Sequence, residues 1–154
     1  MALNFTVVIE SRHRFGDDKP DDVGLETEAP FVGRQKDFVF QCPNVDRSQQ
    51  AILLFQSQGV NIRQRLEING QEIFGGIPAS VEFLSTPTAL RRVAQWNGNV
   101  MLVHPGVLQE SNVLRIQAGD TGDGNIDDFI VDNLVVVFKT RRRPIVNPGE
   151  VATP

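Results

Sequence analysis

The residues best suited to chemistry in this sequence lie in one short acidic loop, Gly119 to Asp128. Hard cations such as Ca²⁺ take about six to eight oxygen ligands, and five side chains of this loop carry oxygens: Asp120, Asp123, Asn125, Asp127 and Asp128. From Asp123 the spacing begins like an EF-hand, but Asp128 stands where the sharp-turn glycine belongs and Leu134 where the bidentate glutamate belongs. Because Asp, Asn and Gly are ordinary turn residues, a solvated hairpin loop is the favoured interpretation. A structural calcium ion is the alternative.

Two of these carboxylates have a second interpretation. Asp127 and Asp128 precede an apolar run, at the start of an expected strand. Side chains alternate between the faces of a strand. We therefore expect one of the two carboxylates to point inward and to accept hydrogen bonds from the backbone of an adjacent loop, a role that needs no ligand.

A second candidate site surrounds the single tryptophan. Arg91, Arg92, Trp96 and Asn97 form a polar, partly aromatic patch that suits a glycan or an acidic partner. Arginine also stacks on indole at a modest gain in energy. The competing interpretation is structural, with Trp96 filling one end of the core and the arginines lying on a solvated helix face.

Catalysis finds little support in the sequence. There are two histidines, His13 and His104, and no nucleophile elbow, zinc-binding H-E-x-x-H or phosphate-binding glycine loop. Pairs of carboxylates that could serve a glycosidase cannot be recognised from spacing in a β fold. We expect a protein that is not an enzyme.

Composition limits the class of protein. The 154 residues make one domain, and a formal charge of −4 argues against nucleic-acid binding. A lone Cys42 excludes an internal disulfide and suits a reducing compartment. Neither a signal peptide nor an apolar stretch of about 20 residues is visible, so no membrane contact is expected. We expect a cytoplasmic protein, or one exported as part of a particle.

Short apolar runs indicate the elements that must position these residues. Leu3, Phe5, Val7 and Ile9 alternate with period two, as in a half-buried strand. Further strands are expected where such runs recur, at 38–40, 51–55, 62–68, 100–103, 113–116 and 134–138.

Turn residues separate these runs. Asn69-Gly70 is the preferred pair for a type I′ hairpin, in which both central residues need positive φ. Residues 14–30 form a long acidic surface loop, and Pro87 opens one short expected helix through Ala94.

These elements predict an all-β protein, an antiparallel β-sandwich of jelly-roll type with seven to nine strands and at most one short helix. An all-β barrel is the competing architecture. Residues 1–140 form the single domain, and residues 141–154 form a basic, proline-containing tail that begins with Arg141-Arg-Arg143.

One succession of features resembles a known family. It consists of Leu66-Glu-Ile-Asn69-Gly70, Trp96, Val103-x-Pro105-Gly106-x-Leu108, Asn112-x-Leu-x-Ile116 and Asp127-Asp-Phe-x-Val131-x-Asn-Leu134. Over about residues 36–138 it resembles the galactose-binding-like jelly rolls, which include sugar-binding modules attached to glycoside hydrolases. The resemblance implies a jelly-roll fold, and by analogy a carbohydrate ligand held by loops at one end of the sandwich.

Two functional hypotheses follow. The first is a non-catalytic binding module with a carbohydrate as its ligand and Trp96 as the stacking platform. The second is a structural or assembly subunit of a larger complex, of the kind found in phage-like or contractile particles. In that hypothesis the acidic segment 14–30 and the basic end 139–154 mediate self-association or hold a protein partner, because their charges are complementary.

Overall fold

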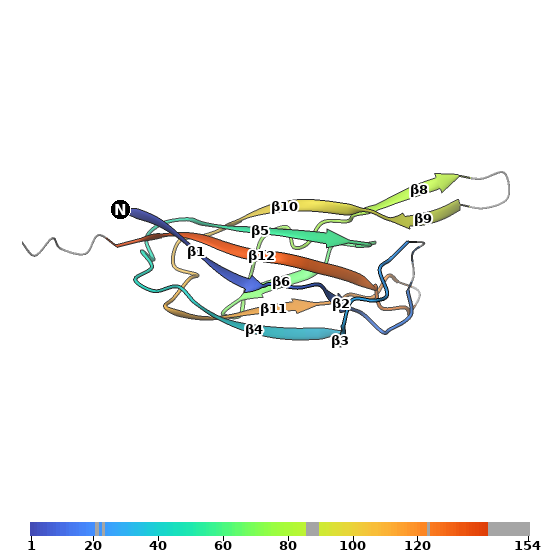
Figure 1. Cartoon of the computed structure of the whole chain (residues 1–154), viewed down its shortest axis with the longest axis horizontal. Coiled ribbons are helices and arrows are strands. Elements are labelled where there is room, and N and C mark those ends of the chain that lie inside the picture. The colour runs from blue at the N-terminus through green and yellow to red at the C-terminus, as the bar shows by residue number, and fades with distance from the viewer. Residues whose placement is uncertain (21, 23, 86–89, 123, 142–154) are drawn as a thin grey trace, which may run out of the picture.

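The computed structural model describes residues 1–20, 22, 24–85, 90–122 and 124–141. Within these residues the protein is all-β, as the sequence predicts, and it contains no helix (Figure 1). The described strands are more numerous than expected, because several are very short. They are β1 (Ala2–Ile9), β2 (His13–Phe15), β3 (Phe31–Gly33), β4 (Gln35–Gln41), β5 (Ala51–Gln58), β6 (Arg65–Ile68), β7 (Gln71–Glu72), β8 (Val81–Ser85), β9 (Leu90–Ala94), β10 (Trp96–Val103), β11 (Ser111–Gln117) and β12 (Phe129–Thr140).

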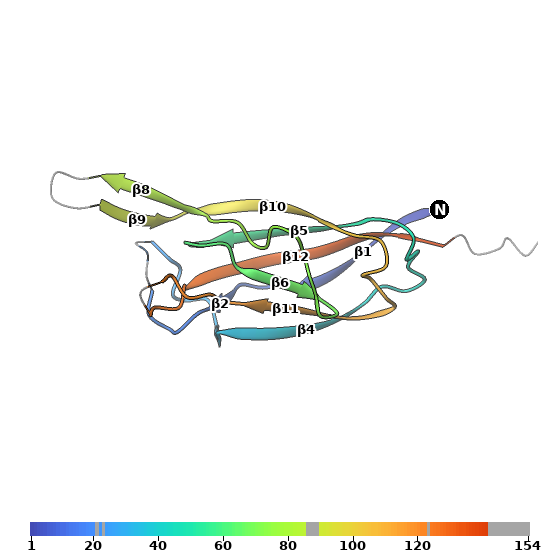
Figure 2. The ribbon, with the colours of Figure 1, turned by 180° about the vertical axis from the view of Figure 1, so that it is seen from behind.

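Two sheets form a sandwich-like body. The larger sheet has the order β10-β5-β12-β2-β3, and β1 pairs with β12 beyond the end of β2. The smaller sheet has the order β4-β11-β6-β7, and Figure 2 shows its long strands from behind. All pairings are antiparallel except that of β2 with β3. Strands β8 and β9 pair only with each other among the described strands and project beyond the body.

The core lies between the two sheets and follows the alternation of their strands. In β11, Leu114 and Ile116 are fully buried, whereas the neighbouring Val113 is exposed. Phe15 of β2 and Phe129 of β12 stack with ring centroids 5.3 Å apart and close one end of this core. Apolar contact of this kind is the main favourable contribution to the fold.

The hairpin predicted at Asn69-Gly70 is confirmed. It joins β6 to β7, with Ile68 opposite Gln71, and Asn69 and Gly70 have φ values of 53° and 75°. Positive φ at both central residues is the geometry that the Asn-Gly pair favours.

The prediction of a short helix from Pro87 to Ala94 is wrong for residues 90–94, which the structure describes. Leu90–Ala94 forms strand β9, in register with Val81–Ser85 of β8. Residues 86–89 lie outside the described part of the chain. The spacing of Leu90, Val93 and Ala94 also fits a helix, but pairing with a neighbouring strand outweighs the weak helical preference of so short a segment.

No helix in the described part of the chain has the length and apolar character needed to cross a membrane.

We expect Leu114→Ala to lower the free energy of unfolding by about 2–5 kcal/mol, because it leaves a cavity at a fully buried position. Val113→Ala on the same strand is the matched control and should cost less than about 1 kcal/mol, since Val113 is exposed. Urea unfolding followed by circular dichroism measures both. Equal losses in the two variants would contradict this description of the core.

Candidate functional site

Trp96 lies at the start of β10 in a polar cluster with Arg12, Glu26 and Asp132, here called the Trp96 cluster. The indole Nε1 donates a hydrogen bond to Glu26 Oε1 at 3.1 Å, and the Arg12 guanidinium lies 5.0 Å from the indole ring centroid. Arg12 also pairs with Glu26, and its Nε lies 3.3 Å from Asp132 Oδ2. Arginine over an indole face is a favourable cation–π arrangement.

The ring is half-buried rather than fully displayed. It packs against a small apolar group that belongs to the segment before β3 and to strands β9 and β12, namely Leu25, Ala29, Ala94 and Ile130. With Arg12 over the ring and Glu26 on its N–H, Trp96 has a structural role whatever else it does.

A shallow hollow of about 440 Å³ adjoins this cluster. Its polar lining is mainly acidic, since Arg12 is accompanied by Glu10, Glu26, Glu28 and Asp132. Carboxylates accept hydrogen bonds and a guanidinium donates them. The hollow therefore offers hydrogen-bond acceptors and, from Arg12, donors that are already shared with Glu26 and Asp132.

The structure brings only part of the predicted patch together. Asn97 is exposed beside Trp96 on β10. Arg91 and Arg92 lie on β9, opposite Leu84 and Phe83 in the backbone register. Arg12, Glu26 and Asp132, which contact Trp96 or each other, were not predicted. Arg12 and Glu26 lie 14 residues apart near the N-terminus and Asp132 lies on β12, and no local pattern in the sequence connects them.

The acidic loop divides into buried and exposed carboxylates. Asp127 is fully buried and accepts hydrogen bonds from Asn61 N (2.9 Å), Asn61 Nδ2 (2.9 Å), Ile62 N (3.3 Å) and Gln64 Nε2 (2.6 Å). It thereby fixes the 61–64 segment to the start of β12, the role expected for one of this pair. Desolvation raises the pKa of Asp127 from 3.8 to about 6, against the opposing effect of the donors from Asn61 and Ile62.

Asp128 is also fully buried and has a different partner. Its Oδ1 lies 3.8 Å from Arg14 Nη1, and Arg14 also pairs with Asp18 at 2.6 Å. Gly16 has a φ of 131°, and a Cβ added there would lie 2.5 Å from Asp128 Oδ1. Only glycine fits so closely against this carboxylate.

The exposed part of the loop has the contacts of a turn. Asp120 Oδ1 accepts hydrogen bonds from Gly122 N at 2.7 Å and Gly124 N at 3.3 Å, and Asn125 O accepts one from Thr121 N. Asp123 lies outside the described residues. Among those described, no three acidic, histidine or cysteine side chains are grouped to hold a metal ion. Calcium binding by this loop therefore stays a prediction.

A group of apolar side chains lies on the outward side of the larger sheet, six of them exposed and three half-buried. We call it the outer face; its residues are Leu3, Phe5 and Val7 of β1, Val135 and Val137 of β12, Ile52 and Leu54 of β5, and Val100 and Leu102 of β10. The period-two pattern of β1 led us to expect burial, but Leu3 and Phe5 are 71% and 64% exposed.

Strand register arranges the outer face as two rows across four strands. One row runs Val7, Val135, Leu54, Val100, and the next runs Phe5, Val137, Ile52, Leu102. Side chains directly opposite each other on neighbouring strands are in contact distance. The rows therefore form one continuous apolar surface.

Comparison with known proteins adds little to this geometry. No family model and no curated protein matches the chain. Among solved structures it is similar to dimeric latent PorU from Porphyromonas gingivalis, with 17% identity over 89% of this chain and a TM-score of 0.39. The chain spans 13% of the length of PorU. A likeness at that level carries no argument about fold or function.

The buried carboxylate of Asp127 predicts a specific dependence of stability on pH. Its pKa is higher in the folded state than in the unfolded chain, so between about pH 4 and pH 6 the folded state binds more protons. Its contribution should therefore lower the free energy of unfolding as pH rises through this range, by up to about 3 kcal/mol.

Asp127→Asn removes this titration, and urea unfolding at pH 4 and pH 7 measures the difference. We expect a smaller loss of stability between the two pH values than in the wild type, on top of a general loss of about 1–3 kcal/mol from disturbed hydrogen bonds. Asp120→Asn, at an exposed carboxylate of the same loop, is the matched control. A wild-type pH dependence in the Asp127 variant would contradict the assignment.

Proposed function

We propose that this protein is a non-catalytic assembly subunit that associates with further copies of itself through its outer face. The observation that carries the proposal is the continuous apolar surface of nine side chains on the four strands β1, β12, β5 and β10. The largest apolar patch on a soluble protein covers roughly 300–600 Å² and is often a functional surface.

The size of the outer face suits the centre of an interface. Strands about 4.8 Å apart and residues rising about 3.3 Å each give the four-strand patch a flat area of roughly 300 Å². A stable dimer buries roughly 800 Å² of accessible surface per partner, so a polar rim must contribute too. Exposed Gln56, Asn133 and Lys139 border the patch and supply such a rim.

A second copy is the occupant that this surface fits best. Its two rows contain no charged residue, so two copies meet face to face without desolvating or opposing charges. A flat apolar sheet is complementary to itself, as in the packing of two sheets about 10 Å apart. A symmetric dimer uses the same patch on both partners.

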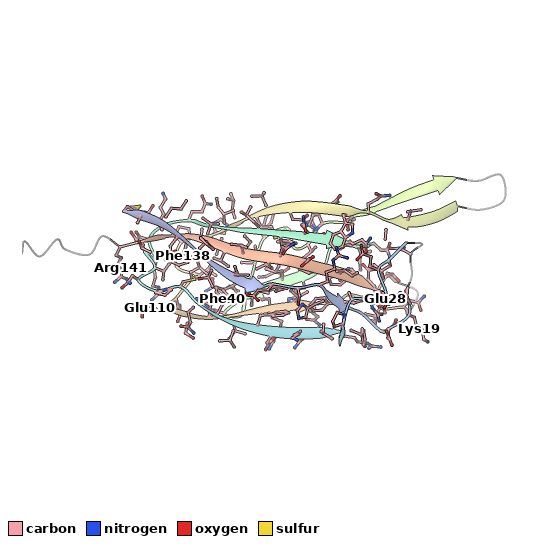
Figure 3. The ribbon with its side chains drawn as sticks, viewed as in Figure 1. Lys19, Glu28, Phe40, Glu110, Phe138 and Arg141 are labelled. Carbon is pink, nitrogen blue, oxygen red and sulfur yellow. The ribbon has the colours of Figure 1, made fainter. Side chains whose placement is uncertain are left out.

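The charged segments also favour contacts between copies. Arg141 lies at one end of the sandwich, whereas Lys19 and Glu28 of the acidic segment lie at the other (Figure 3). The described start of the basic end and the acidic segment, which were predicted to attract each other, are thus separated by the length of the body. Attraction between these two ends therefore favours a contact between molecules, and a head-to-tail contact of this kind builds rings or filaments.

Light-scattering mass tests the proposal with substitutions at exposed positions, where the fold tolerates a charge. We expect the full chain to be a dimer or larger, and Phe5→Glu, alone or with Leu102→Glu, to shift it to monomer. Val39→Glu is the control, because Val39 is 71% exposed on β4 of the other sheet. A wild-type monomer, or equal disruption by Val39→Glu, would sink the proposal. A truncation after Thr140 measures the separate contribution of the basic tail.

We also infer a jelly-roll connection of the strands and a relationship to the galactose-binding-like proteins. Two features support this inference. The sandwich is built mainly from antiparallel strand pairs, and the Asn69-Gly70 hairpin and the β11–β12 region carry residues that resemble the family.

A carbohydrate-binding module is the second candidate function, favoured by the hollow beside the Trp96 cluster. Four carboxylates and one guanidinium line it, and sugar hydroxyls both donate and accept hydrogen bonds. The half-buried indole supplies an aromatic surface nearby. A structural calcium ion in the 119–128 loop belongs to this second candidate.

Because Trp96 is the single tryptophan, its fluorescence reports directly on this site. If the protein binds a carbohydrate, titration with a glycan selected on an array changes the fluorescence emission of Trp96. Glu26→Gln then weakens binding at least about tenfold, because it removes a charged hydrogen-bond partner. Glu110→Gln, at the opposite end of the body (Figure 3), is the control. The carbohydrate hypothesis is abandoned if no glycan changes the emission, with or without Ca²⁺.

A further inference from the structure

Strand β10 has a free edge. It is the last strand of the larger sheet, and in the described part of the chain no strand pairs with its second side. Over its eight residues, Trp96 to Val103, it carries no proline and no charged residue. Soluble proteins normally protect a long edge with charges, prolines, bulges or a covering segment. An unprotected edge of this length is a template for an incoming strand.

A groove runs along this edge. It has a volume of about 530 Å³ and lies between β10 and the segment that follows β7. Five consecutive residues, Gly98 to Leu102, line it, and their side chains alternate between the two faces of the sheet. Because side chains from both faces of β10 line the groove, the groove lies along the edge of this strand. The backbone groups at this edge pair with no other described strand.

The far wall of the groove is apolar. It contains Phe74, Gly75, Gly76 and Pro78. Phe74 is 89% exposed, the largest exposed fraction among the described large apolar side chains. An aromatic side chain held in solvent beside a free strand edge offers a contact for an apolar side chain of a bound segment.

The charge of the groove is opposite to that of the protein. Its lining includes Arg63 and His104 and no acidic residue, although the whole chain has a formal charge of −4. Complementary charge steers a partner and fixes its register. The groove therefore selects against basic segments and favours acidic ones.

We infer that the β10 edge is a strand-addition site for an extended segment of a partner protein, apolar at alternate residues and acidic near Arg63. In strand addition the main-chain hydrogen bonds supply affinity, and pockets for alternate side chains supply specificity. This site shares Val100 and Leu102 with the outer face, but it differs from the proposed self-association because it uses the backbone edge of β10 and the segment after β7, and it does not involve β1.

Fluorescence anisotropy with the full chain tests the inference. The probe is a labelled ten-residue peptide of alternating valine and threonine with two glutamates replacing threonines. We expect saturable binding, at least tenfold weaker binding when lysine replaces the glutamates, and none when proline replaces alternate residues. Selection from a display library of random ten-residue peptides should likewise enrich alternating apolar and acidic sequences that lack proline.

Paired variants separate the groove from general charge effects. Arg63→Glu should weaken binding at least tenfold, whereas Arg34→Glu, an equal change of charge at an exposed residue beside β4, should leave it unchanged. Phe74→Ala should weaken binding without loss of stability, because Phe74 is so exposed. Slower hydrogen exchange in β10 on binding would report the new backbone hydrogen bonds, which a contact of side chains alone would not produce.

Three results would overturn the inference: no selected peptide binds, proline-containing peptides bind equally well, or Arg63→Glu behaves like Arg34→Glu. Phe5→Glu, the variant designed to abolish self-association, should bind the peptide like the wild type. Failure of strand addition and failure of the assembly proposal are therefore distinguishable.

Discussion

The pairing of β12 on both of its edges is the constraint on which the rest of the structure depends. Its 12 residues pair with β5 along one side and with β2 and then β1 along the other. A bulge at Asn133, whose φ is 50°, places one extra residue between Asp132 and Val135. The extra residue sets the alternation of the second half of the strand, so that Leu134, Val136 and Phe138 face the core while Val135 and Val137 face outward. The sandwich core and the outer face thus follow from the same register.

Buried carboxylates hold the end of the sandwich from which β12 starts. Asp127 joins the segment 61–64 to this strand, and Asp128 lies against Gly16 and Arg14 of the β2 region. Burying a carboxylate is costly unless it is hydrogen-bonded or paired. Two such groups at adjacent positions concentrate polar contacts where the sheets end, whereas the outer face of the larger sheet is apolar and that of the smaller sheet carries ion pairs such as Arg115–Asp37.

The surface therefore has candidate functional features of three kinds, of which the outer face and the groove meet at Val100 and Leu102 of β10. The outer face lies on the larger sheet, the groove lies along the β10 edge of that sheet, and the hollow beside Trp96 lies near the first residue of β10. The first two contain mainly apolar side chains and backbone, which suit contacts with protein. The third contains carboxylates and an arginine whose charges already neutralise one another in part, so it is the most self-contained. This difference is the reason for ranking association above recognition of a small molecule.

Local chemistry in the sequence determined the all-β class, the Asn69-Gly70 hairpin and the inward role of one carboxylate of the 127–128 pair, because turn residues and period-two alternation act over a few residues. Alternation could not show which face of a strand meets the core. The register shift between Val7 and Ile9 buries Ile9 and turns Phe5 and Val7 outward, so an apolar pattern that looked like core became surface. Leu90–Ala94 became a strand because of its partner β8. The Trp96 cluster and the groove join residues far apart in the chain, and only the tertiary structure decides such contacts, since they depend on strand pairing and not on the residues that adjoin them in sequence.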